Sequence, residues 1–201
     1  MTTLLYFEEY ESNLSHELLK RKDINPIIIR TNKNMRFFSV SYLELTKNVL
    51  NYVIDYYNDI DEEVLKFKNW LKNNDIRIDY FFNDSEYYLE FSNRFASKLG
   101  LYALTVEHIG WVRDKVDMKK KFREIGLNTV DFKEINSKDE IKNFFVNNGS
   151  KRIIFKPRRG MNSIETYMIN SLEDIDDLEI DITPGKYMVE DFCYDHEWSI
   201  E

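Results

Sequence analysis

Apolar and polar positions along the first half of the chain follow two periods, one typical of strands and one typical of helices. Compact apolar runs at residues 3–9, 25–31 and 76–82 predict strands. The run at 25–31 is apolar at most positions, as in a parallel strand that is buried on both faces. Apolar residues at helical spacing predict helices at residues 12–22, 41–58, 61–75 and 85–100. Strands and helices in this order predict an α/β fold with an open parallel sheet.

Residues 41–58 and 61–75 carry the two longest helical patterns. In the first, the apolar residues that share one face are Leu43, Val49, Leu50, Val53 and Ile54. In the second, Asp61 is in position to cap the helix, and the predicted buried stripe consists of Val64, Leu65, Phe67, Trp70 and Leu71. We therefore assign residues 1–104 to a Rossmann-like unit, although the glycine fingerprint of dinucleotide-binding folds is absent from it.

The second half of the chain, from Thr105 onward, mixes helices with short strands. Asp114 is in position to cap a helix at residues 115–126. Ser137 and Glu140 have the spacing of a capping box before the next helix. The remaining predicted elements are helices at 138–148 and 171–178 and strands at 128–135, 151–157, 164–169, 187–192 and 197–201. This order predicts a second, α+β unit.

Composition and charge restrict the classes of function. Hydrophobic residues make up 43% of the 201, which is enough to bury a core. The formal net charge of -8 disfavours a general binder of nucleic acid or of anionic membranes. No apolar run approaches the roughly 20 residues of a membrane span, and the start of the chain lacks the basic region of a signal peptide. The single Cys193 cannot form an internal disulfide, so a cytoplasmic protein is expected.

A basic turn follows the strand at 151–157 and is the first candidate for chemistry. Lys156 lies at the end of this apolar strand, and Arg158, Arg159, Gly160 and Ser163 follow in the turn. A cation fixed by a strand, beside exposed amides and a hydroxyl, is what a polyphosphate requires. The alternative is a basic hairpin tip in solvent. The turn is not a Walker A loop, because the glycine spacing and the Lys-Ser/Thr pair are missing.

Carboxylates near the end of the sequence are the second candidate. Glu190 and Glu197 are separated by the short connector DFCYDH. Carboxylates placed in this way could accept hydrogen bonds from an exocyclic amine and from ribose hydroxyls. The alternative is an acidic edge strand whose charge keeps the protein soluble. No spacing of His, Cys and Asp residues indicates a zinc site.

The order of these motifs resembles the ATP-grasp superfamily of carboxylate-amine/thiol ligases, which includes biotin carboxylase, D-alanine–D-alanine ligase and the large subunit of carbamoyl phosphate synthetase. The motifs are Asp114-Lys115, then IIFKP, VEDF and EWSIE, and they cover the chain from about Thr105 to Glu201. The resemblance implies a Rossmann-like pre-ATP-grasp domain at residues 1–104 and the N-terminal lobe of the ATP-grasp module at 105–190. Residues 191–201 would be the hinge and the first strands of an incomplete second lobe.

The resemblance also implies a role for each matching residue. Lys115 would reach the ATP phosphates, and Lys156 would lie over the α-phosphate and adenine N7. Glu190 would face the adenine amino group, and Glu197 would bind the ribose. Without the resemblance, Lys115 is an ordinary lysine of a first helical turn. The neighbouring lysines at 119, 120 and 121 are interpreted as a solvated helix face.

Two further segments take their roles from the same resemblance. Asp191, Phe192 and Cys193 would form the hinge, with main-chain atoms of Asp191 and Cys193 pairing with the adenine edge. Arg158 to Ser163 would form the phosphate lid. The family's Gly-x-Gly-Ser-x-Gly-Val lid becomes GMNSIET, in which Gly160 and Ser163 remain and two glycines are lost. A lid with fewer glycines approaches phosphates less freely.

The activity implied for the parent protein is ATP-dependent ligation. A carboxylate attacks the γ-phosphate to give an acyl-phosphate and ADP, and an amine then displaces phosphate. The implied cofactors are ATP and Mg²⁺, with the Mg²⁺ ligands on strands that follow EWSIE, so this chain alone is expected not to catalyse ligation. The expected partners are ATP and a small carboxylate substrate, with no nucleic acid and no membrane, and a homodimer is left open.

Two other interpretations stay open at this point. One is a non-catalytic, Rossmann-like binding or interaction module with a degenerate ATP site. The other is an ATP-grasp kinase that phosphorylates a small molecule.

Overall fold

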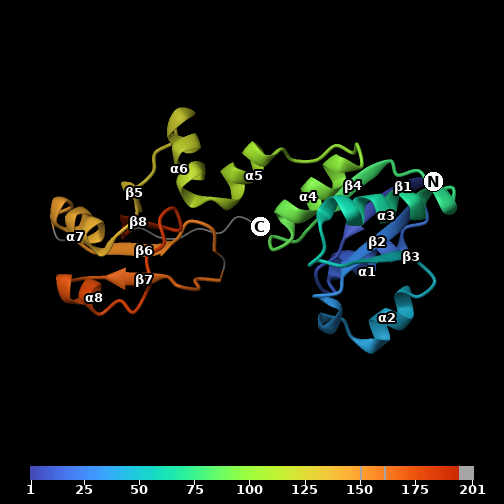
Figure 1. The fold of residues 1–201 in the computed structure, drawn as a ribbon, viewed down its shortest axis with the longest axis horizontal. Coiled ribbons are helices and arrows are strands. Elements are labelled where there is room, and N and C mark those ends of the chain that lie inside the picture. Colours follow the sequence, from blue (N-terminus) through green and yellow to red (C-terminus); the bar gives the residue numbers. More distant parts are fainter. Residues whose placement is uncertain (150, 161, 195–201) are drawn as a thin grey trace. The chain divides into compact units, whose positions relative to one another are not determined.

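The structure is a computed structural model that describes residues 1–149, 151–160 and 162–194. The chain divides into two compact units, Met1–Glu107 and His108–Glu201 (Figure 1). The predicted strand at 197–201, which begins at Glu197, lies outside the described residues.

The first unit is built on a parallel sheet of four strands in the order β3-β2-β1-β4 (Figure 1). The strands are β1 (Thr2–Phe7), β2 (Ile24–Thr31), β3 (Leu50–Ile54) and β4 (Tyr80–Asn83). The register sets Leu5 opposite both Ile27 and Phe81. The sequence prediction of an open parallel α/β sheet is therefore confirmed for this unit.

Helices α3 and α4 cover one face of this sheet. The helices of the unit are α1 (Asn13–Lys20), the 3-10 turn η1 (Met35–Phe37), α2 (Val40–Thr46), α3 (Ile60–Asn73) and α4 (Leu89–Lys98). Phe67 of α3 and Phe95 of α4 join the same buried cluster as Phe7, Ile27 and Ile29 of the strands. These strand positions share a face because alternate residues of a strand point the same way.

The long helix predicted at residues 41–58 is wrong. The structure has α2 at Val40–Thr46 and then β3 at Leu50–Ile54, which pairs in parallel with β2. Residues 50–54, LNYVI, carry β-branched and aromatic side chains that favour a strand. Their burial alternates, with Ile54 buried and Val53 exposed. The helical spacing of these apolar residues also fits a period of two, and pairing with β2 decides between the periods.

Three finer predictions for the first unit are also corrected. Helix α3 is capped by Asp59, whose side chain accepts from the N–H groups of Asp61 and Glu62, so Asp61 is not the cap. Leu65 was placed in the buried stripe, but 60% of its surface is exposed. Strand β4 is shorter than predicted, because Ile76 and Ile78 pack against the core without strand pairing.

The second unit contains an antiparallel sheet in the order β5-β8-β6-β7. Its strands are β5 (Phe132–Ile135), β6 (Ile153–Pro157), β7 (Tyr167–Ile169) and β8 (Tyr187–Asp191). Its helices are α6 (Lys115–Glu124), α7 (Lys138–Asn147) and α8 (Leu172–Asp176), and α5 (Val106–Arg113) begins just before the unit boundary. Asp114 and Ser137 cap α6 and α7, as the sequence predicts. The Glu140 carboxylate accepts from the N–H of Asn136, one residue before the cap.

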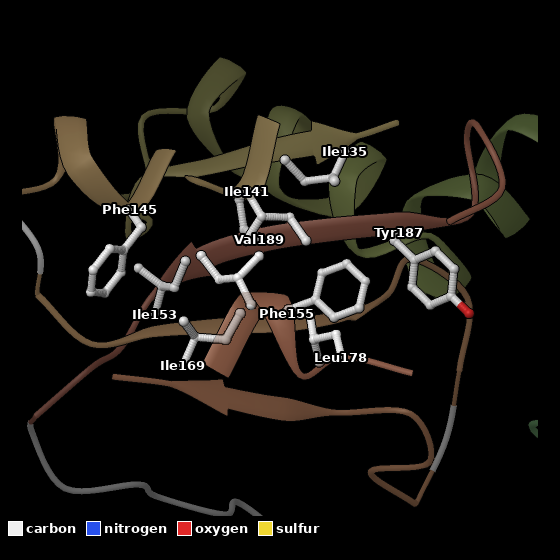
Figure 2. Packing of buried hydrophobic residues seen from close by; sticks show 10 residues of the cluster. Ile135, Ile141, Phe145, Ile153, Phe155, Ile169, Leu178, Tyr187 and Val189 are labelled. Atoms are coloured by element: carbon white, nitrogen blue, oxygen red, sulfur yellow. The ribbon is translucent and has the colours of Figure 1, made fainter. Parts of the chain in front are cut away.

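One face of this sheet packs against α7 and α8 (Figure 2). Phe155 of β6 and Val189 of β8 lie opposite each other and belong to this core. The neighbouring residues in each strand therefore point to the other face. That face carries Lys156 and Glu190, and the packing of the core fixes the register that brings them together.

Within the described residues, none of the helices has both the length and the apolar character needed to cross a membrane.

Candidate functional site

Two lysines from different elements line one cavity of the second unit. Lys115 comes from the first turn of α6 and Lys156 from β6, and both line a cavity of about 200 Å³. The Lys115 ammonium donates to the carbonyl of Gly160 at 3.0 Å, and its backbone N–H donates to the carbonyl of Arg158 at 3.0 Å. The other lining residues are Pro157, Gly160, Asn162, Ser163, Ile164 and Thr166. The structure thus brings together four of the residues that the sequence singled out: Lys115, Lys156, Gly160 and Ser163.

The turn after β6 keeps a glycine-like backbone without the glycines. Asn162, Ser163 and Glu165 have φ angles of 53°, 55° and 54°. Asn162 and Glu165 stand where the family lid motif has its second and third glycines. Residues with a Cβ adopt this left-handed region at an energetic cost. The turn therefore has the shape that glycines would give, at a cost in backbone strain.

The side chain of Glu165 fastens this turn to the start of β8. Its Oε2 accepts from the Tyr187 hydroxyl at 2.8 Å and lies 3.1 Å from the Lys186 ammonium. The hydrogen bonds from Tyr187 and Lys186 hold the pKa of the Glu165 carboxyl below its usual range.

Glu190 lies between two lysines. Its Oε1 accepts from the Lys156 ammonium, and its Oε2 lies 3.1 Å from the ammonium of Lys119. The side chains of Lys119, Lys156 and Glu190 are only 14%, 18% and 12% exposed. The interpretation of Lys119 as part of a solvated helix face is therefore wrong, whereas Lys120 is exposed. Lys119 follows Lys115 by four residues, and this helical spacing is the signal that could have identified it.

A second, larger cavity of about 630 Å³ lies beside Glu190. It is lined by Lys119, Phe122, Asn128, Thr129, Val130, Ile154, Glu190, Asp191, Phe192 and Cys193. The predicted hinge residues thus share a cavity with Glu190. The N–H of Asp191 donates to the carbonyl of Asp131 and that of Phe192 to the carbonyl of Arg152, so these two amides are engaged in the sheet. Burial, together with the charges of Asp131 and Glu190, raises the pKa of the Asp191 carboxyl.

Arg158 is next to the Lys115–Lys156 cavity in the chain but does not line it. Its guanidinium donates to Asp114 and Glu134 at 3.0 and 2.7 Å and lies 3.4 Å from Asp117. Burial alone would lower the pKa of Arg158, but Asp114 and the other carboxylates outweigh it and raise the pKa. The structure gives Arg158 a bracing position between α6, β5 and β6, and its role as a phosphate ligand stays a prediction.

The described residues contain no group of three or more His, Cys, Asp or Glu side chains that could hold a metal ion. Cys193 is exposed and not in a disulfide.

Comparison with solved structures identifies the fold. No family model and no curated protein sequence matches the chain. The L-amino acid ligase of Bacillus licheniformis is similar with a TM-score of 0.65 and 14% identity, over 96% of this chain and 44% of that one. An N5-carboxyaminoimidazole ribonucleotide synthetase in complex with ADP is similar with a TM-score of 0.68 and 10% identity, over 96% of this chain and 47% of that one. The biotin carboxylase domain of 2-oxoglutarate carboxylase from Hydrogenobacter thermophilus, in complex with MgADP, is similar with a TM-score of 0.65 and 12% identity. This match covers 96% of this chain and 44% of that one.

The chain has the fold of the N-terminal part of ATP-grasp ligases. It spans less than half the length of these structures. The prediction of a Rossmann-like unit followed by an ATP-grasp N-terminal lobe is confirmed as a fold. At 10 to 14% identity, the ATP-grasp likeness extends to the fold alone.

Proposed function

We propose that this chain is the ATP-binding portion of an ATP-grasp ligase whose parent protein activates a carboxylate as an acyl-phosphate for attack by an amine. The observation that carries the proposal is the convergence of Lys115 and Lys156 on one cavity, with Glu190 paired to Lys156 beside a second cavity. Helix, strand and turn supply a cationic pocket next to a partly apolar one. A nucleoside polyphosphate has the matching distribution of charge.

The smaller cavity is the proposed site of the phosphates. Lys115 and Lys156 would neutralise the phosphate oxygens, and the Ser163 hydroxyl would add a donor. A Cβ at Gly160 would lie 3.4 Å from Pro157 Cβ, which is a tolerable contact. We therefore propose that a glycine is useful here because its backbone can approach the ligand closely, and not because a side chain would clash. The ammonium of Lys115 would exchange its bond to the Gly160 carbonyl for one to a phosphate.

The larger cavity is the proposed site of the base. Phe122, Val130 and Ile154 offer apolar surface to a purine ring, and Glu190 offers an acceptor for an exocyclic amine. Main-chain atoms of Asp191 and Cys193 are proposed to pair with the base edge. Because the N–H of Asp191 donates to the carbonyl of Asp131, other main-chain atoms of this segment would have to pair with the base edge. Glu197, the proposed ribose ligand, lies outside the described residues.

Magnesium, when bound in such a ligase, screens the charge of the transferred phosphoryl group. The described residues do not offer a site that fits it, since they contain no metal-binding group of acidic side chains. We therefore assign this chain the binding and orientation of ATP and no step of the ligation. For the same parent ligase we also propose a small carboxylate substrate, a homodimer and a cytoplasmic location. Among similar structures, the H. thermophilus domain is described as a dimer in complex with MgADP and bicarbonate.

Titration calorimetry with a non-hydrolysable ATP analogue tests the proposal on the 201-residue chain. Lys115→Met and Lys156→Met are each expected to weaken binding by about tenfold or more, the loss typical of one charge-assisted contact. Lys120→Met, on the exposed side of the same helix, is the matched control and should leave affinity unchanged. Absence of saturable binding, or equal affinity in all four proteins, would contradict the proposal.

A non-catalytic module with a degenerate site is the second candidate. Two observations favour it. Non-glycine residues stand at the left-handed positions of the lid, and Glu190 pairs with Lys156, one of the lysines proposed to bind phosphate. Absence of nucleotide binding would support this module. Release of ADP in the presence of magnesium and a hydroxyl substrate, without an amine, would instead support a small-molecule kinase.

A further inference from the structure

We propose that Lys119 is a positioning residue for base recognition, which holds the carboxylate of Glu190 so that the site selects a purine with an exocyclic amino group. The inference rests on the proposed ATP site and deepens it. Lys119 does not need to touch the nucleotide phosphates for this role.

Helix α6 directs two lysines to two different cavities. Lys115 lines the smaller cavity and Lys119 lines the larger one. They are four residues apart, so they lie one above the other on the same helix face. Lys120, the next residue, is exposed. The single helix thereby couples the phosphate pocket to the base pocket.

The contacts of Glu190 define what Lys119 does. Lys156 occupies Oε1, and Lys119 lies 3.1 Å from Oε2. Oε2 is fully buried and has no well-aligned hydrogen bond from any described residue. The contact with Lys119 is therefore an ion pair that leaves acceptor capacity at Oε2, because each carboxylate oxygen can accept about two hydrogen bonds.

Two cations, one on each oxygen, fix the orientation of the carboxylate. If Lys119 were absent, both oxygens could turn toward Lys156, and the acceptor would leave the larger cavity. An adenine amino group donates to a carboxylate oxygen. Hypoxanthine has a carbonyl at the same position, and two acceptors facing each other repel. Lys119 would thus act on the choice of base through Glu190.

The competing explanation is that Lys119 only holds α6 against the sheet. Its ammonium lies 5.9 Å from the centre of the Phe132 ring, and loss of these contacts would destabilise the unit. If the role of Lys119 were purely structural, its substitution would weaken the binding of all ligands alike. A positioning role changes the ratio between bases and leaves a ligand without a base unaffected.

The experiment measures the affinities of ATP, inosine triphosphate and inorganic tripolyphosphate for the 201-residue chain. Wild type is expected to prefer ATP over inosine triphosphate by about tenfold, the size of one hydrogen bond to a charged group. Lys119→Met should abolish this preference, so that ATP and inosine triphosphate bind with about equal affinity, while the affinity for tripolyphosphate is unchanged. Lys119→Arg keeps the cation and should retain the preference. Lys120→Met is the control, and Lys115→Met should weaken all three ligands.

A second measurement uses the pair of variants at the ion pair itself. Glu190→Gln should abolish the preference for ATP, and Lys119→Met added to it should cause no further change, because the two residues act as a unit. Full preference in a folded Lys119→Met protein, or equal losses for all three ligands, would overturn the inference and leave the proposed ATP site standing. Failure of wild type to bind any of the three ligands would overturn both.

Discussion

The guanidinium of Arg158 and the carboxylate of Asp114 form a two-pronged ion pair. Nε of Arg158 donates to Oδ1 at 3.0 Å, and Nη2 lies 3.0 Å from Oδ2. Asp114 Oδ1 also accepts from the backbone N–H groups of Val116 and Asp117 and so caps α6. One carboxylate thereby joins the start of α6, which carries Lys115, to the end of β6, which carries Lys156. The distance between the two candidate phosphate-binding lysines depends on this pair.

Arg158→Met is expected to destabilise the second unit by about 2–4 kcal/mol, because it removes the closer of the two cations beside the buried Asp114 carboxylate and leaves only Arg159, whose Nε lies 3.4 Å from Oδ2. Asp114 is 5% and Arg158 14% exposed at the side chain. Urea unfolding followed by hydrogen exchange of the β6 and α7 amides measures the loss in this unit separately. Arg123→Met, which breaks the exposed pair with Asp131, is the control and should cost less than about 1 kcal/mol. Equal small effects of both substitutions would refute the bracing role of Arg158.

The second unit is expected to lose stability in acid. Burial raises the pKa of Asp114, but the hydrogen bond and charge of Arg158 outweigh burial and hold it below 3.8. A carboxyl with a lowered folded pKa stabilises the fold above its unfolded pKa, and this contribution is lost as the pH falls through the folded pKa. The free energy of unfolding should therefore decrease as the pH falls below 3.8. Urea titrations across this range should give a flatter dependence for Asp114→Asn, and an equally steep one would contradict the assignment.

The first unit contains a fully buried ion pair between Glu8 and Arg30. Arg30 Nε donates to Glu8 Oε2 at 2.8 Å, and Tyr42 donates to Oε1 at 2.5 Å. Arg30→Met is expected to cost about 3–5 kcal/mol, since an unpaired carboxylate stays in the core. Urea denaturation of this unit measures the cost.

The double variant Glu8→Gln/Arg30→Met is expected to recover part of that loss, because it removes the stranded charge. Arg21→Met, which removes an exposed partner of Asp23, serves as the control and should have no measurable effect. A double variant that is less stable than Arg30→Met would argue that hydrogen bonding by Glu8 matters more than its charge.

Substitutions at Asn162 separate backbone strain from side-chain function in the lid. With φ at 53°, Asn162→Gly is expected to stabilise the second unit by about 0.5–1 kcal/mol. Asn162→Ala should destabilise it, because alanine tolerates the left-handed region less well than asparagine. Thermal unfolding of the two variants beside wild type measures the difference. Equal stabilities of the glycine and alanine variants would mean that position 162 does not hold this conformation in solution.

The sequence predicted the first unit well where apolar runs were compact. The strands around Ile27–Ile29 and Leu5–Phe7 follow from continuous apolar residues, which a sheet covered on both faces buries. The sequence failed at residues 50–54, whose spacing fits both a helix and a strand. Parallel pairing with β2 resolved that ambiguity, and pairing is a contact between distant segments.

The candidate site divides in the same way. Lys115, Lys156, Gly160 and Ser163 were predicted, and the structure places them around one cavity. Lys119 was missed, since three lysines in a row on a helix resemble a solvated face. The role of Arg158 as a phosphate ligand stays a prediction, and the structure adds that its guanidinium pairs with Glu134 of β5 and with Asp114, the cap of α6.

The sequence by itself determined most strands and helices in their order, with β3 as an exception, as well as the caps at Asp114 and Ser137 and the series of lysines and glutamates that resembles ATP-grasp ligases. Only the tertiary structure decided which charges meet. Lys156 and Glu190 are 34 residues apart and become partners through the register of β6 and β8. Partial burial favours such pairing, because an ammonium or carboxylate that is removed from water is stabilised by an opposite charge. The identity of that partner depends on how the sheet and the helix pack, which no local pattern encodes.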